Sequence, residues 1–216
     1  MTNVRYGKLA TGLIGGWFLL SLAASALKVF ENVSAGPPVL LGLAVLIPVV
    51  LFSSWYGASA GFRQFAMTLD PRALTMVQAW RIGGFVFLVL HAHGILPGLF
   101  ALPAGWGDIA IGLTAPLVAT KLSHANHRRG FILWQLLGML DLVMAVSLGT
   151  LAGLIRPDGI ATGAMTVLPL SLIPTFAVPL LIVFHVICIA HARRWPRGEQ
   201  PGRAATPLHA RHEAGA

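Results

Sequence analysis

The chain has 216 residues, of which 56% are hydrophobic and only 10% are charged. Soluble domains carry about 25% charged residues, so the composition argues against a soluble domain, a disordered chain and a coiled coil. The mean hydropathy of +0.77 instead predicts an all-α, polytopic membrane protein. In a soluble protein, the net charge of +8 would suggest a nucleic-acid partner. In membrane proteins, however, basic residues gather in the cytoplasmic loops, so no nucleic-acid partner is expected.

Six segments are apolar over the length of about 20 residues that a helix needs to cross a bilayer. They are predicted at about 9–27, 39–55, 74–96, 105–122, 131–155 and 168–191. Asp70 is expected to cap the third span, with Pro71 at its first helical position. Prolines predict kinks in the fourth and sixth spans because each lacks a backbone donor; they are Pro116, Pro169, Pro174 and Pro179.

The first span has a second interpretation. Arg5 and Lys8 precede an apolar run that ends in small residues at 24–26, which is the layout of a cleavable secretory signal peptide. The run is long enough to cross the membrane, and this favours its retention as a helix.

Basic residues predict the orientation of the spans. With the N-terminus in the cytoplasm, all of the 15 lysines and arginines except Lys28 and Arg156 lie on the inner side. The positive-inside rule therefore predicts that both termini are cytoplasmic. The preference for arginine over lysine points to a bacterial inner membrane.

One transmembrane domain, residues 1–191, is expected to be followed by a disordered basic cytoplasmic tail, residues 192–216. The tail contains few large apolar residues. Arg193, Arg194 and Arg197 are its candidates for contact with anionic lipid, and an ordinary stop-transfer flank is the favoured explanation for them.

Ionisable side chains within the spans are the candidate functional residues, because such groups are costly in a membrane and usually face the bundle interior. The candidates for a proton or ion relay are Arg81, His91, Asp108, Asp141 and His185. Asp108 and Asp141 share their helix faces with glycine and alanine, which predicts that both point at neighbouring helices. Counted at about 1.5 Å per residue, Arg81 lies roughly 5–10 Å from the inner surface and Asp108 lies near the outer one.

These groups have two interpretations. Spread across the membrane, they suit a proton relay. Alternatively they form structural pairs, with Asp108 bonded to His91, Asp141 to a neighbouring helix and Arg81 to backbone or lipid phosphate. An acid at the depth of Asp141 must find a cation or bind a proton.

The histidines and the single cysteine suggest possible metal and haem sites. His185, Cys188 and His191 are one turn apart and are candidate metal ligands, although a structural site needs four. Haem would need His91 and His185 on opposite faces of one ring. Because their estimated depths differ by about 10 Å, no cofactor is expected and haem remains an alternative.

Two further features concern packing. Glycine pairs four residues apart suggest close helix contacts, within the chain or in a homo-oligomer; they are Gly12–Gly16, Gly94–Gly98 and Gly149–Gly153. Segment 97–107 is interpreted as a tight outer connection, with a re-entrant substrate-lining segment as the alternative.

Together these observations predict a small permease or channel-like protein with proton-linked movement of an unknown small solute. The alternatives are a haem-binding redox module and a non-catalytic partner subunit in the membrane. No enzyme is favoured, because no nucleophile and base stand together in the sequence.

The orientation can be tested with reporter fusions. We expect fusions after Arg72, after Arg129 and at the C-terminus to report a cytoplasmic location, and fusions near Pro103 and Asp158 to report a periplasmic one, because of the uneven distribution of basic residues. A periplasmic C-terminal reporter would contradict the orientation.

Overall fold

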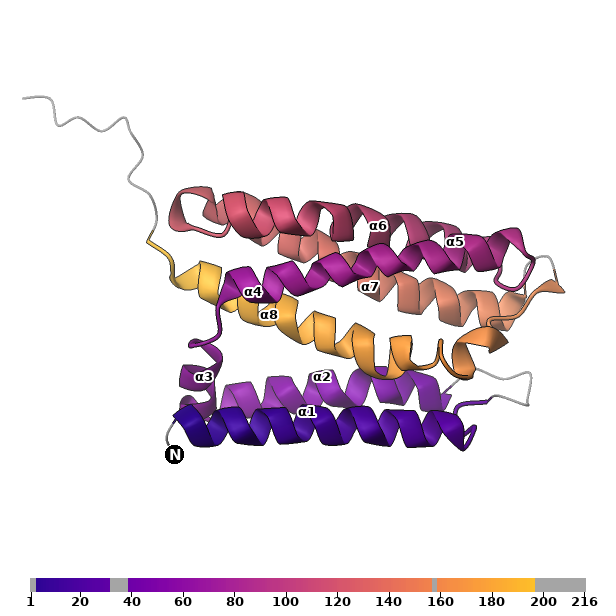
Figure 1. Cartoon of the computed structure of the whole chain (residues 1–216), viewed down its shortest axis with the longest axis horizontal. Helices are drawn as coiled ribbons and strands as arrows, with labels where there is room; N and C mark the ends of the chain where they lie inside the picture. The colour runs from indigo at the N-terminus through magenta and orange to yellow at the C-terminus, as the bar shows by residue number, and fades with distance from the viewer. Residues whose placement is uncertain (1–2, 32–38, 157–158, 197–216) are drawn as a thin grey trace, which may run out of the picture.

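The computed structural model describes residues 3–31, 39–156 and 159–196. These residues form helices and turns, without a β-strand in the described ranges. Six of the helices are long and apolar enough to span a membrane, and they are packed as one elongated bundle (Figure 1). The prediction of an all-α polytopic membrane protein with six spans is therefore confirmed.

The elements follow one another along the chain as a series of long helices joined by short turns. They are α1 (Asn3–Ala26), α2 (Val39–Ala58), α3 (Ala60–Ala66), α4 (Pro71–Val77), η1 (Gln78–Gly84), α5 (Phe85–Ala92), α6 (Gly98–Lys121), η2 (Ala125–His127), α7 (Arg128–Ile155), η4 (Gly163–Thr166), η5 (Ile173–Ala177) and α8 (Val178–Arg194).

The helices are arranged in layers. In Figure 1, α1 and α2 lie along one side, α8 crosses the middle, and α4, α5, α6 and α7 lie on the other side. The start of α1 and the end of α8 lie at the same end of the bundle, which we call the termini end; the turn between α5 and α6 lies at the opposite, far end. Large apolar side chains such as Leu46, Leu113 and Leu133 are exposed on the outer faces, as expected where lipid is the solvent.

The third span is one continuous segment, Pro71–Ala92, made of α4, η1 and α5. Asp70 caps it as predicted, since its side chain accepts a hydrogen bond of 2.9 Å from the Arg72 amide and Pro71 occupies the first turn. The central part, η1, is a 3₁₀ helix, which is unusual in the middle of a span and often marks a functional or strained segment.

The fourth span begins seven residues earlier than predicted. Helix α6 starts at Gly98 and continues through Pro103 and Pro116 to Lys121. The interpretation of segment 97–107 as an outer connection is therefore wrong. The turn between α5 and α6 is formed by the residues between Ala92 and Gly98, where Gly94 has a φ of +70°. Small residues and a proline in a membrane helix allow close packing, and in this sequence they resembled a loop.

The sixth span begins with a short π-helical segment, η5, followed directly by α8. Pro179 has no backbone N–H and cannot donate to the Thr175 carbonyl four residues earlier. That carbonyl accepts hydrogen bonds from α1 instead, at 3.1 Å from Trp17 Nε1 and at 3.3 Å from Ser21 Oγ. A proline in one span therefore leaves a carbonyl free to accept hydrogen bonds from α1.

This contact can be tested by replacing both donors. We expect the double variant Trp17→Phe, Ser21→Ala to lower the thermal midpoint in detergent, because a buried carbonyl that loses its partners costs about 1–3 kcal/mol. Each kcal/mol corresponds to about 2–4 °C in a chain of this size. Trp106→Phe, at a tryptophan that is 62% exposed, is the matched control and should leave the midpoint unchanged. An unchanged midpoint in the double variant would show that these bonds do not hold α1.

Candidate functional site

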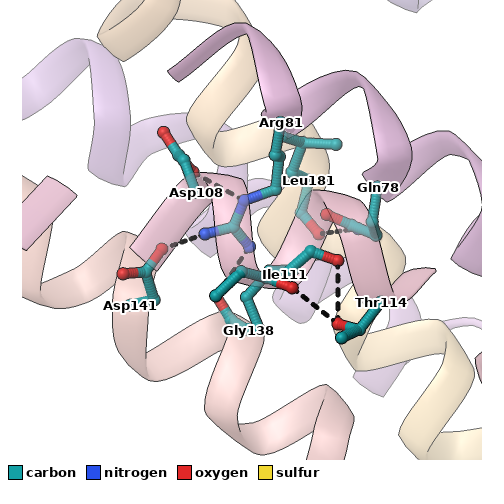
Figure 2. Close-up of polar contacts among 9 residues, drawn as sticks. Gln78, Arg81, Asp108, Ile111, Thr114, Gly138, Asp141 and Leu181 are labelled. Atoms are coloured by element: carbon teal, nitrogen blue, oxygen red, sulfur yellow. Dashed lines mark hydrogen bonds and ion pairs between the residues drawn. The ribbon is translucent and has the colours of Figure 1, made fainter. Parts of the chain in front are cut away.

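The candidate site is centred on Arg81, whose side chain is only 2% exposed. Its Nε donates to Asp108 Oδ1 at 2.7 Å, its Nη1 donates to the Gly138 carbonyl at 3.0 Å, and its Nη2 donates to Asp141 Oδ2 (Figure 2). One guanidinium thus joins the third, fourth and fifth spans through two ion pairs and one backbone bond. We call Arg81, Asp108 and Asp141 the charged triad.

The triad lies near the middle of the bundle. Arg81 is ten residues after the start of its span at Pro71, and Asp108 is ten residues after the start of α6 at Gly98. At about 1.5 Å per residue, both lie roughly 15 Å from the nearest helix end, which is half the thickness of the hydrocarbon core. The estimate that placed Asp108 near the outer surface and Arg81 near the inner one is therefore wrong. Both spans were predicted to begin too late, the third at about residue 74 instead of Pro71 and the fourth at about residue 105 instead of Gly98.

Both carboxylates face protein, as the registers of small residues predict. The Asp108 and Asp141 side chains are 14% and 17% exposed. Glycines on the facing helices make room for them: a Cβ on Gly84 would overlap Asp108, and a Cβ on Gly107 would overlap Asp141. The glycine positions are therefore part of the site, although sequence inspection alone assigned them no role.

His185 lies beside the triad and is completely buried. A Cβ on Gly138 would be 2.7 Å from His185 Nε2 and 3.4 Å from Arg81 Nη1, so the imidazole faces the guanidinium across this glycine. The other ring nitrogen, Nδ1, is 2.5 Å from Gln135 Oε1.

From Gln135 a chain of hydrogen bonds continues toward the termini end. Gln135 Nε2 donates to Thr75 Oγ1 at 2.9 Å, and Thr75 Oγ1 donates to the Pro71 carbonyl at 2.7 Å. All three side chains of this polar chain, His185, Gln135 and Thr75, are 0% exposed. Gln135 and Thr75 were not among the predicted site residues, because neither side chain is ionisable. The signal that could have identified them is an uncharged polar residue within an apolar span.

His91 is not part of this site. Its Nδ1 is 3.1 Å from the Leu96 carbonyl, so it bridges the turn between α5 and α6 at the far end. The predicted pair of Asp108 and His91 is therefore wrong, because Asp108 is bonded to Arg81. His93 is exposed on the same turn, and its Nδ1 lies 2.8 Å from the Val89 carbonyl.

The haem and metal interpretations do not fit the geometry. The His185 ring packs against Gly138 so closely that a methyl group would not fit there, which leaves no space for a porphyrin at Nε2. Cys188 lies 3.7 Å from Thr75 Oγ1, and His191 Nε2 lies 3.3 Å from the Ala66 carbonyl. Within residues 3–31, 39–156 and 159–196, no group of three or more histidine, cysteine or acidic side chains is placed to hold a metal ion.

The remaining predicted features lie at the periphery. Arg193 and Arg194 are exposed at the end of α8, where the lipid-contact prediction stays a prediction. Arg197 and the predicted tail beyond it lie outside the described residues. Gly149 and Gly153 contact Phe100 and Thr162 of the same chain, whereas a Cβ on Gly12 or Gly16 would meet no described atom within 4 Å. A homo-oligomer through that α1 face stays a prediction.

A comparison with known families assigns the chain to a family. The family described as "Domain of unknown function (DUF8737)" matches residues 37–193, so the chain belongs to this family. The match runs from the start of α2 almost to the end of α8, includes the charged triad and the polar chain, and leaves α1 outside. No curated protein and no solved structure matches the chain.

The close fit around the triad can be tested with a single methyl group. We expect Gly107→Ala to lower the thermal midpoint, because the added Cβ displaces the Asp141 carboxylate and overpacking typically costs about 1–3 kcal/mol. Gly15→Ala is the control, since a Cβ there meets nothing within 4 Å and alanine favours a helix over glycine by about 1 kcal/mol. A midpoint that rises equally in both variants would contradict the described packing.

Proposed function

We propose that this member of the DUF8737 family is a small permease that couples the movement of a solute to the movement of a proton. The observation that carries the proposal is the charged triad, in which one arginine is bonded to two aspartates halfway across the membrane. Ionisable groups at this depth are costly, and they mark substrate, ion or proton pathways more often than surface ion pairs do.

The charges of the triad do not balance. Arg81 carries one positive charge, and two ionised carboxylates carry two negative charges, so the triad with both acids ionised has a surplus of one negative charge. An uncompensated charge in a low-dielectric interior is strongly disfavoured. The triad therefore binds one proton or one cation in its stable state, and exchange between the two is the coupling step.

Polar groups and a cavity extend from the triad in opposite directions. Toward the termini end, the polar chain of His185, Gln135 and Thr75 reaches the carbonyl of Pro71 at the start of the third span. Toward the far end lies a cavity whose lining residues include Asp108, Thr162 and Met165. A proton arriving along the polar chain and a solute arriving through the cavity would meet at the same charges.

The distribution of basic residues supports an orientation with both termini in the cytoplasm, and the preference for arginine over lysine supports a bacterial inner membrane. Six spans bring the start of α1 and the end of α8 to one end of the bundle (Figure 1), and that end carries Arg193 and Arg194. In this orientation the polar chain faces the cytoplasm and the cavity faces the outside.

Replacing Asp141 by asparagine tests the proposal. Asparagine keeps the size and an acceptor oxygen for Arg81 but removes the surplus charge, so we expect Asp141→Asn to be purified at near wild-type yield. In vesicles loaded with a pH-sensitive dye, an imposed membrane potential should drive proton uptake through the wild-type protein. The variant should transport protons no faster than vesicles without protein.

Asp70→Asn is the matched control, because it makes the same chemical change at an exposed helix cap and should transport protons like the wild type. A collapsed yield of Asp141→Asn would identify a structural pair and favour the partner-subunit alternative. Undiminished proton uptake in that variant would remove Asp141 from the transport mechanism.

A further inference from the structure

The cavity beside the triad lies between several helices and is partly open to the surroundings. Its walls come from α2, α5, α6, α7, η4, η5 and the start of α8. The cavity is lined mainly by apolar side chains, among them Val45, Phe87, Phe100, Leu142 and Met165.

Asp108 is the only charged residue among the described residues that line this cavity. Its Oδ1 accepts the bond from Arg81, whereas its other carboxylate oxygen points away from the guanidinium in Figure 2. The cavity also contains threonine side chains, but those of Thr150 and Thr166 donate to the carbonyls of Val146 and Gly163 in their own helices. The Asp108 carboxylate is therefore the charged group that the cavity offers to a ligand, and the Thr162 side chain adds a hydroxyl to the cavity wall.

We propose that the cavity is a binding site for a lipophilic monovalent cation, whose charge contacts Asp108 and whose apolar body lies against the aromatic and aliphatic walls. This inference rests on the proposed function and names the chemical class of the solute that the permease would transport. The surplus negative charge of the triad matches exactly one positive charge, and an anion would be repelled by it. The attraction between the cation and the Asp108 carboxylate is stronger in an apolar cavity than in water, because the local dielectric constant is low.

A neutral apolar molecule would fill the same walls but would leave the charge of the triad uncompensated. A small hydrated cation would satisfy the charge but would leave the apolar walls without contacts. The combination of one carboxylate with apolar walls therefore selects an ion that carries its charge within an apolar body.

The test measures binding of radiolabelled tetraphenylphosphonium to the purified full-length protein by equilibrium dialysis. We expect saturable binding to the wild type. Asp108→Asn should weaken it by about tenfold or more, which is the usual effect of losing a charge-assisted contact. Triphenylphosphine oxide, which has similar rings without a net charge, should compete at least about tenfold more weakly than unlabelled tetraphenylphosphonium.

A second variant fills the cavity without touching the triad. Gly42 lines the cavity from α2, and a Cβ there would meet nothing within 4 Å, so Gly42→Leu is expected to fold. Because the leucine side chain would occupy part of the cavity, the variant should weaken binding by about tenfold or more. Gly57→Leu is the matched control, because Gly57 lies on the same helix outside the cavity and also has open space at its Cβ. Its affinity should equal that of the wild type.

The outcomes separate this inference from the proposed function. Absence of saturable binding to the wild type, or unchanged binding in folded Asp108→Asn or Gly42→Leu, would overturn the cation site. Proton uptake that still depends on Asp141 would then leave the permease proposal standing. Conversely, binding that follows the expected pattern without any proton uptake would support the site and overturn the proton coupling.

Discussion

The rest of the structure depends on the hydrogen bonds of one guanidinium that lies in the middle of the helix bundle. Arg81 makes bonds from three of its nitrogens to α6 and α7, and each of these bonds crosses between spans. A buried arginine without partners would be strongly disfavoured, so the positions of Asp108, Asp141 and the Gly138 carbonyl are constrained together. This constraint sets how the third, fourth and fifth spans pack.

The surrounding helices are adapted to that packing. Gly84, Gly107 and Gly138 lack the Cβ atoms that would overlap Asp108, Asp141 and His185. The third span is a 3₁₀ helix where it carries Arg81 and Gly84. In lipid, where burial of apolar surface between helices provides little driving force, such close contacts and polar bonds contribute much of the association between spans.

The polar residues are unevenly distributed over the bundle. Toward the termini end the interior contains a hydrogen-bonded chain of uncharged side chains, and toward the far end it contains an apolar cavity with Asp108 in its wall. Helix α1 stands apart from this organisation. It contacts the Thr175 carbonyl through Trp17 and Ser21, carries neither triad residues nor cavity-lining residues, and lies outside the family match.

Composition and periodicity determined the number of spans, because a stretch of about 20 apolar residues has few other stable solutions in a membrane. The sequence also identified Arg81, Asp108, Asp141 and His185 as costly groups that must face protein, and Asp70 as a helix cap. It could not determine which of them meet, because depth depends on where each helix begins, and the small residues before Asp108 resembled a loop. Only the tertiary structure decided that Asp108 bonds Arg81 rather than His91, that Gln135 and Thr75 continue the contacts of His185, and that a cavity opens beside one carboxylate. These features depend on side chains from different spans meeting at the same depth, and spacing along a single helix carries no information about that.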